Sequence, residues 1–333
     1  MISQTIKIGI VLLALTAFVI VIPTSGSFVV LLATRAMAFA ILAMSVDILL
    51  GFTGLSSLGQ AAYFGVGAYL TAVLATKFHV GLGWDFWLVV VLGMLIGGAL
   101  AAVFGLFAIR AGGVYFLMIT LALGQCVWGL AYRWNSVTGG DNGINLSGRP
   151  SFGLDLSNEV TFFYLVFGFF AVSMALMYVL VRSPFGRSLV GIRERELRMQ
   201  ILGYNTWLHK YIAFIIAGAF GGLSGVLWAQ TNGHVSPDTL VLTTSVDALL
   251  MVVLGGAGTL VGAVIGAAIV FGMREYLSTL VPWWQYALGA VYVLTILYLP
   301  SGLMGVPARI RQARASAAAR DVGDSIEELP VKT

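Results

Sequence analysis

The sequence predicts an all-α integral membrane protein with about ten transmembrane helices. Its composition, its long apolar segments and the clustering of its few charges lead to this prediction. Of its 333 residues, 59% are hydrophobic and only 10% are charged, whereas about 25% of the residues of a soluble domain are charged. A water-soluble fold of this size cannot hide so much apolar surface, because most of its outer surface must face water. The solvent for most of the chain is therefore the lipid bilayer.

Other classes of protein are excluded by the same composition. The single cysteine, Cys126, cannot supply the disulfides of a small secreted scaffold. The net charge of +4 comes from a few basic residues in loops, so nucleic acid is not an expected partner. The chain has no Gly-x-x-x-x-Gly-Lys-Ser/Thr sequence and no catalytic or metal-ligand pattern. We therefore expect neither an enzyme nor a cofactor.

Crossing a hydrocarbon core of about 30 Å takes about 20 apolar residues. Continuous apolar segments occur at residues 8–22, 28–50, 87–109, 114–132, 160–181, 211–228 and 283–299. The first of them has no small-residue cleavage pattern after it, so we expect a retained span rather than a signal peptide. Segments 53–76 and 246–276 are equally apolar but are interrupted by glycines.

Basic residues predict the orientation, because Lys and Arg in short loops stay in the cytoplasm. They gather in the loop 182–207 (Arg182, Arg187, Arg193, Arg195 and Arg198) and in the tail 306–333 (Arg309, Arg311, Arg314 and Arg320). The loop 133–159 is poor in basic residues and is expected to be external. The tail returns to the cytoplasm only if an even number of crossings follows the loop 182–207. Both termini are therefore cytoplasmic only if 246–276 forms two short helices. The membrane domain covers 1–305, and the tail is either a surface helix or disordered.

Two glycine-rich segments suggest interrupted helices. The first contains Gly51, Gly54 and Gly59 together with Thr53, Ser56, Ser57 and Gln60, and the second contains Gly255, Gly256 and Gly258. Irregular backbone at membrane depth is stable only where it is buried in protein or lines a watery cavity. Close helix packing by small residues is the alternative explanation. Both remain open at this point.

Short sequence matches link these two segments. Leu-Gly-x-x-Gly occurs at 50–54 and 254–258, and Ser-Val-Asp-x-Leu-Leu occurs at 45–50 and 245–250. Broken helices at corresponding places in two halves of a transporter indicate a transport site between repeats. The alternative is a chance match in a chain rich in Leu, Val and Gly.

Few polar groups fall inside the predicted spans. Asp47 and Asp247 are costly to bury in lipid, so they should face the bundle interior or water. They belong either to a polar pathway or to structural hydrogen bonds, and the same choice applies to Gln60 and Gln125.

The loop 182–207 contains a predicted short helix. Pro184 and Gly186 indicate a turn, and residues 188–202 then follow a helical pattern that ends at Gly203. Four apolar residues, Leu189, Ile192, Leu197 and Ile201, are expected on one side. Arg193, Glu194, Arg195 and Glu196 are expected to be largely solvated. Such a helix either docks another protein or simply connects two spans.

Several sequence segments, in this order, carry a family resemblance. They are G-F-T-G-L-S-S-L-G-Q-A-A-Y-F-G-V-G-A-Y at 51–69, G-G-V-Y-F-L-M-I-T-L-A at 112–122, W-N-S-V-T-G-G-D-N-G-I at 134–144, S-P-F-G-R-S-L-V-G-I-R-E at 183–194, L-G-Y-N at 202–205 and M-V-V-L-G-G-A-G-T-L-V-G at 251–262. Across roughly residues 28–305 the chain resembles the M-type permease subunit of bacterial branched-chain amino-acid ABC importers. Members often have His at the position of Gln60 and Glu at that of Asp247. Urea, amide and sugar permeases share much of the pattern.

The resemblance implies a mechanism. Such permeases work in pairs, usually with a second, homologous permease, in the bacterial inner membrane. Two cytoplasmic ATPase subunits drive the pair, and a periplasmic binding protein delivers the solute to the external loop. By this analogy the ATPase-coupling residues are Phe185, Gly186, Arg187, Arg193, Glu194, Arg195 and Gly203. The pathway candidates are Asp47, Thr53, Ser56, Ser57, Gln60, Thr120, Gln125 and Asp247. An ATP-independent secondary transporter or channel is the alternative, and the lack of paired membrane carboxylates argues against it.

Overall fold

A computed structural model describes residues 22–24, 26–78, 80–81, 83–146, 148, 158–280, 283–298 and 302–304. The predicted first span, 8–22, lies outside the described residues except for Ile22. The tail 306–333 and most of residues 147–157 also lie outside them.

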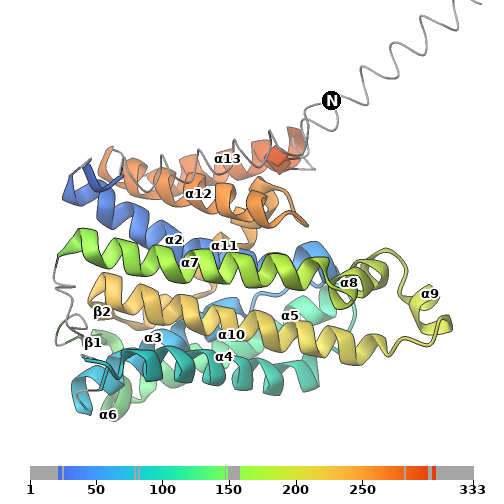
Figure 1. The fold of residues 1–333 in the computed structure, drawn as a ribbon, viewed down its shortest axis with the longest axis horizontal. Coiled ribbons are helices and arrows are strands. Elements are labelled where there is room, and N and C mark those ends of the chain that lie inside the picture. Colours follow the sequence, from blue (N-terminus) through green and yellow to red (C-terminus); the bar gives the residue numbers. More distant parts are fainter. Residues whose placement is uncertain are drawn as a thin grey trace, which may run out of the picture.

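The described chain is mainly helical (Figure 1). The longer helices are α2 (Ser27–Asp47), α4 (Phe86–Ala108), α5 (Val114–Arg133), α7 (Glu159–Arg182), α10 (Thr206–Asn232) and α12 (Leu260–Leu280). The shorter ones are α3 (Gln60–Lys77), α6 (Asn135–Thr138), α8 (Pro184–Glu194), α9 (Glu196–Ile201), α11 (Leu242–Gly255) and α13 (Trp284–Tyr298). A π-helix, η2 (Ile48–Thr53), continues α2, and the single-turn helices are η1 (Ile22–Thr24), η3 (Gly140–Asn142) and η4 (Pro237–Leu240).

Within the described residues, six helices are long and apolar enough to cross a membrane. They are α2 with η2, α4, α5, α7, α10 and α12, so the protein is a multi-pass membrane protein. The predicted count of about ten is not confirmed, because some predicted spans form shorter helices than the roughly 20 residues that a bilayer needs. Helix α3 has 18 residues, α11 has 14 and α13 has 15.

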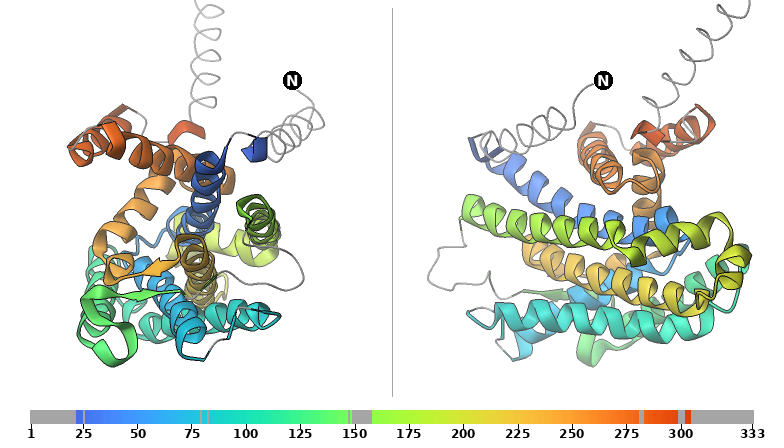
Figure 2. Two further views of the ribbon diagram at one scale, coloured as in Figure 1. Left: turned by 90° about the vertical axis from the view of Figure 1, so that its left-hand side faces the viewer. Right: turned by 45° about the vertical axis from the view of Figure 1, so that its right-hand side comes forward.

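Helix α10 lies at the centre of the bundle, where it packs against α4, α3 and α2 (Figure 2). Small residues allow these backbones to approach closely, as is usual between membrane helices. A side chain at Gly222 would overlap the Gly93 carbonyl of α4, and one at Gly67 of α3 would overlap the Gly222 carbonyl. Aromatic rings fill the adjoining core, where Phe39 of α2 lies 5.0 Å from the Trp228 ring of α10.

The Arg-rich loop and the predicted external loop occupy opposite ends of the bundle (Figure 1). Helices α8 and α9 form one end. At the other end, β1 (Ile144–Asn145) pairs antiparallel with β2 (His234–Val235) beside α6. The His234 Nδ1 and Asn145 Oδ1 atoms lie 2.7 Å apart across this pair.

Candidate translocation site

The first glycine segment interrupts the path from α2 to α3. The π-helix η2 widens the last turn, and the Thr53 hydroxyl donates a hydrogen bond to the Ile48 carbonyl at 2.9 Å. The chain then turns at Gly54, whose φ of 76° suits glycine better than any other residue. Helix α3 begins only at Gln60. The predicted span 53–76 therefore begins too early, because residues 54–59 are not helical.

Side chains from two other helices bind the irregular segment 54–59 and the first turn of α3. The Thr120 hydroxyl of α5 accepts a hydrogen bond from the Leu58 amide at 3.2 Å. The Ser245 hydroxyl of α11 accepts one from the Ala61 amide at 2.8 Å. Both hydroxyls are wholly buried. Sequence reasoning included Thr120 but missed Ser245, although Ser245 begins the second copy of the Ser-Val-Asp motif.

The second glycine segment separates α11 from α12. Residues 256–259 are not helical, and Gly258 has a φ of 86°. The Thr259 hydroxyl donates to the Gly256 carbonyl at 2.7 Å. This interruption overlaps the predicted one at Gly255–Gly258 and lies one residue later.

The two interruptions meet in space. The Gly258 amide donates a hydrogen bond to Oδ1 of Asp47 at 2.7 Å, across 211 positions of sequence. Gly51 lies against the same backbone, so a side chain there would overlap both the Gly258 amide and the Asp47 carboxylate. We call Asp47, Gly51, Gly54 and Gly258 the glycine junction.

The contacts between the two motif copies are reciprocal. Asp47 of the first copy binds the second interruption, and Ser245 of the second copy binds the chain after the first interruption. Asp247 departs from this correspondence, because it forms an ion pair with Arg274 of α12 at 3.2 Å. This pairing agrees with the structural alternative for Asp247.

Arg193 of α8 also reaches the glycine junction. Its Nη1 donates a hydrogen bond to the Gly51 carbonyl. Its aliphatic stem lies against Gly54, with Cγ 3.0 Å from the place that a Gly54 side chain would take. Arg193 is exposed, as expected, but its guanidinium also donates to the Gly51 carbonyl of the membrane segment.

The predicted helix 188–202 is two helices. Helix α8 starts at Pro184, with the Ser183 hydroxyl accepting from the Gly186 amide at 3.2 Å as an N-cap. The chain turns to an extended conformation at Arg195, and α9 then begins at Glu196. This turn rotates α9, so the expected single apolar side is wrong. Leu189 and Ile192 of α8 are buried, whereas Leu197 and Ile201 of α9 are 75% and 86% exposed.

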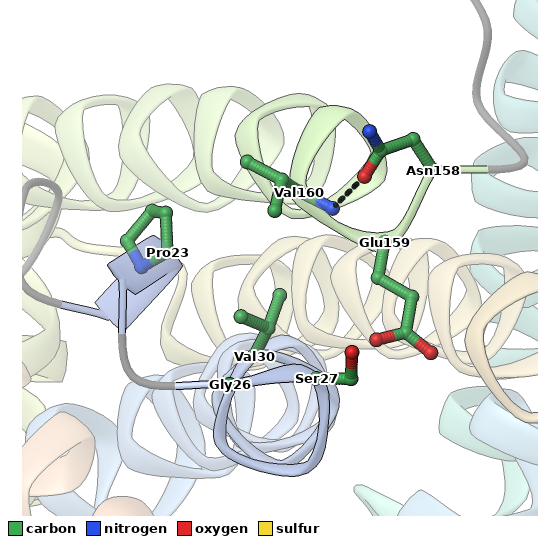
Figure 3. A pocket seen from close by; sticks show the side chains of 7 residues that line it. All are labelled: Pro23, Gly26, Ser27, Val30, Asn158, Glu159 and Val160. Carbon is green, nitrogen blue, oxygen red and sulfur yellow. Dashed lines mark hydrogen bonds between the residues drawn. The ribbon is translucent and has the colours of Figure 1, made fainter.

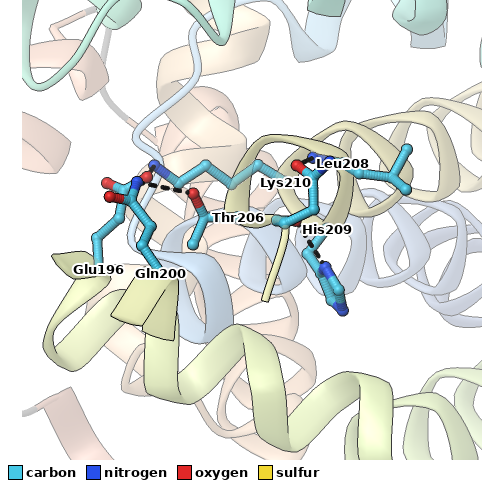
Figure 4. Close-up of polar contacts among 7 residues, drawn as sticks. Glu196, Gln200, Thr206, Leu208, His209 and Lys210 are labelled. Atoms are coloured by element: carbon cyan, nitrogen blue, oxygen red, sulfur yellow. Dashed lines mark hydrogen bonds and ion pairs between the residues drawn. The ribbon is translucent and has the colours of Figure 1, made fainter. Parts of the chain in front are cut away.

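Polar contacts join α9 to the start of α10 (Figure 4). Lys210 and Glu196 form an ion pair at 2.6 Å, and the Gln200 amide donates to the Thr206 hydroxyl at 3.1 Å. Phe185 stacks on the His209 ring at 5.6 Å between centroids. These contacts fix the α8–α9 segment to the end of a central helix.

The remaining predicted residues surround the junction less directly. Gln60 is wholly buried, and within the described chain neither polar atom of its side chain has a hydrogen-bond partner. Ser57 is buried and accepts from the Gly59 amide at 3.2 Å. Ser56 and Gln125 are half-buried. Arg187, Glu194 and Gly203 are exposed on the α8–α9 segment.

A cavity of about 420 Å³ lies elsewhere, between the first turns of α2 and α7 (Figure 3). Its lining residues are Pro23, Gly26, Ser27, Val30, Asn158, Glu159 and Val160. None of them is a predicted site residue. The cavity lies at the first turn of α2, and the glycine junction lies at the other end of this helix. At 1.5 Å per residue, the two are about 30 Å apart.

Comparison with known proteins assigns the family. Residues 28–299 match the family described as "Branched-chain amino acid transport system / permease component". The chain belongs to this permease family. The match covers the glycine junction and the α8–α9 segment, and it confirms the resemblance drawn from the sequence segments.

Individual relatives of this permease carry more specific descriptions. It is 31% identical to the "High-affinity branched-chain amino acid transport system permease protein LivM" of Salmonella typhimurium, over 91% of this chain and 76% of the relative. It is 22% identical to the permease protein LivH of the same organism and transport system, over 82% of this chain and 93% of LivH. It is 32% identical to the "Guanosine ABC transporter permease protein NupQ" of Bacillus subtilis, over 40% of this chain and 44% of NupQ. No solved structure matches.

Proposed function

We propose that this permease is the membrane subunit of an ATP-driven importer of branched-chain amino acids. In this proposal it lies in a bacterial inner membrane with both termini cytoplasmic. A periplasmic binding protein delivers the solute, and two separate ATPase subunits hydrolyse ATP. The observation that carries the proposal is the glycine junction, where two interrupted helices and the α8–α9 segment come into contact.

The irregular segment 54–59 supports a translocation role. Gly54 is exposed, and Ser56 and Leu58 are half-buried. Irregular backbone at membrane depth is stable only where it is buried in protein or lines a watery cavity, so this side of the segment must be covered by protein or by water. A second permease whose surface encloses an aqueous pathway with segment 54–59 meets both requirements.

Helix α5 is our proposed contact surface for the second permease. Helices α5 and α7 are the least covered of the six spanning helices. The exposed side of α7 carries large apolar residues, among them Val172, Leu176 and Val179, which suit lipid. On α5 the exposed Ala122 and Cys126 and the half-buried Gln125 offer small and polar groups for a helix–helix contact, beside the exposed apolar Met118 and Leu130. The similarity to both LivM and LivH supports a homologous partner.

The exposed surface of α9 is our proposed ATPase contact. Helix α9 lies at the end of the bundle opposite β1 and β2. Its residues Leu197 and Ile201 are exposed and are close in sequence to the exposed Arg195 and Arg198. Exposed apolar side chains with a charged rim are typical of a protein–protein interface.

Charge reversal tests this contact. The double variant Arg195→Glu/Arg198→Glu is expected to insert normally but to lose co-purification with the ATPase subunits. ATP-driven uptake should fall at least about tenfold, because like charges across an interface cost several kcal/mol. Arg133→Glu, at the opposite end of the bundle, is the control and should keep co-purification with the ATPase subunits. An unchanged yield of ATPase subunits with the double variant would contradict the docking role.

Uptake by the assembled transporter tests the proposed function. In proteoliposomes with the binding protein outside and ATP inside, we expect labelled leucine to accumulate, with isoleucine and valine as competitors. The similarity to the guanosine permease makes guanosine the informative alternative solute, and urea represents the other family members. Accumulation of guanosine or urea but not leucine would refute the amino-acid assignment. Uptake by this chain alone under an ion gradient would favour the secondary transporter.

A further inference from the structure

The α8 residue Arg193 is exposed like its neighbours, but its side chain is hydrogen-bonded to the membrane part of the protein. Its neighbours Arg195 and Arg198 make no side-chain hydrogen bond or ion pair with the rest of the described chain. Arg193, by contrast, donates to the Gly51 carbonyl. Of these three exposed arginines, Arg193 is therefore the one whose side chain is tied to the described membrane segment.

One side chain reaches both helix interruptions. The Arg193 stem lies on Gly54 in the first interruption. Its Nη1 atom lies 3.2 Å from the place that a Gly258 side chain would take in the second interruption. The absence of side chains at Gly54 and Gly258 leaves the space that the guanidinium and its stem occupy.

A buried carboxylate completes the arrangement. Asp47 is wholly buried, and its Oδ1 accepts the Gly258 amide. Its Oδ2 has no hydrogen-bond partner among the described residues, and Arg193 is the cation whose charge acts on it. A guanidinium has five N–H donors, so Arg193 has donors left over for Oδ2 after it binds the Gly51 carbonyl. The junction thus offers Arg193 two acceptors, the Gly51 carbonyl and the free Asp47 oxygen.

We propose that Arg193 is a latch that transmits movement of the α8–α9 segment to both helix interruptions at once. Arg193 is a positioning residue: it contacts neither solute nor ATPase, and it holds Gly51 and Gly54 against Gly258. The transport part of this proposal rests on the proposed function. The structural part concerns the chain alone.

Hydrogen–deuterium exchange of the full-length chain tests the structural part. In Arg193→Ala we expect the amides of residues 49–60 and 254–260 to exchange about tenfold faster, the factor that corresponds to losing one charged hydrogen bond. Arg193→Lys keeps the charge but has one donor group, so its exchange should be intermediate. Arg198→Ala removes the same charge from the same segment and should leave both regions unchanged. Wild-type exchange in Arg193→Ala would overturn the latch.

The assembled transporter tests the transmission. Arg193→Ala should still hydrolyse ATP, while the amount of leucine taken up per ATP falls about tenfold. A docking defect differs from this, because it lowers hydrolysis stimulation and uptake together. Wild-type uptake per ATP in Arg193→Ala would overturn the transmission role. If the wild-type transporter shows no ATP-driven uptake, the proposed function is refuted. The hydrogen–deuterium exchange result still tests whether Arg193 holds the two interruptions together.

Discussion

Alanine in place of Gly51 is expected to abolish uptake and to prevent the native packing of the glycine junction. The added methyl group would overlap the Gly258 amide and the Asp47 carboxylate, and backbone atoms cannot move aside as a flexible side chain can. Overpacking of a close contact typically costs about 1–3 kcal/mol, and a collision with backbone lies at or above the upper end. The measurement is the thermal unfolding temperature of the purified chain, together with leucine uptake by the assembled transporter.

Gly168 provides the matched control for this substitution. It lies inside the spanning helix α7, and no atom lies within 4 Å of the place that its side chain would take. Gly168→Ala should therefore leave stability and uptake unchanged. Equal behaviour of the two variants would contradict the close contact between the two interruptions.

Removal of the Asp47 carboxylate should have the second-largest effect. Asp47→Ala leaves the Gly258 amide buried without its acceptor, which costs about 1–3 kcal/mol. Asp47→Asn keeps a carbonyl oxygen as acceptor and loses only the charge. We expect Asp47→Ala to lower the unfolding temperature and uptake strongly, and Asp47→Asn to retain most of the stability.

The comparison of these two variants separates the roles of Asp47. If Asp47→Asn is as unstable as Asp47→Ala, the charge toward Arg193 dominates over the hydrogen bond to Gly258. If both variants are as stable as the wild type, the carboxylate does not hold the junction, and the account of the site is wrong.

Much of the architecture follows from composition. Lipid-exposed helices need long apolar segments, so the segments 87–109, 114–132 and 160–181 predict α4, α5 and α7 within a few residues. Glycine clusters were the local signal for both interruptions. The lengths of α3 and α11 were not predictable in this way, because glycine-rich apolar sequence is compatible with helix and with irregular backbone alike.

The contacts that define the site depend on tertiary structure. Arg193 and Gly51 are 142 positions apart, and a cluster of arginines on a short helix gives no sign of which one bonds to the membrane segment. The turn at Arg195 also has no local signal, since neither Gly nor Pro occurs between Ile192 and Gly203. Ser245, in contrast, could have been found from the repeated Ser-Val-Asp motif.

In our proposal, segment 54–59 faces an aqueous pathway within the membrane. Because the chain has one cysteine, Cys126→Ala gives a background in which a single thiol can be placed at will. Ser56→Cys places it on the irregular segment, and Val172→Cys places it on the exposed apolar side of α7, where Val172 is 58% exposed.

The decisive measurement is the rate at which a charged, water-soluble methanethiosulfonate reagent modifies these two thiols in the membrane-embedded, assembled transporter. We predict rapid modification of Ser56→Cys, with the rate changing when the ATPase subunits are trapped with nucleotide, and no modification of Val172→Cys, which faces lipid. If Ser56→Cys is as unreactive as Val172→Cys in every nucleotide state, segment 54–59 does not line the pathway.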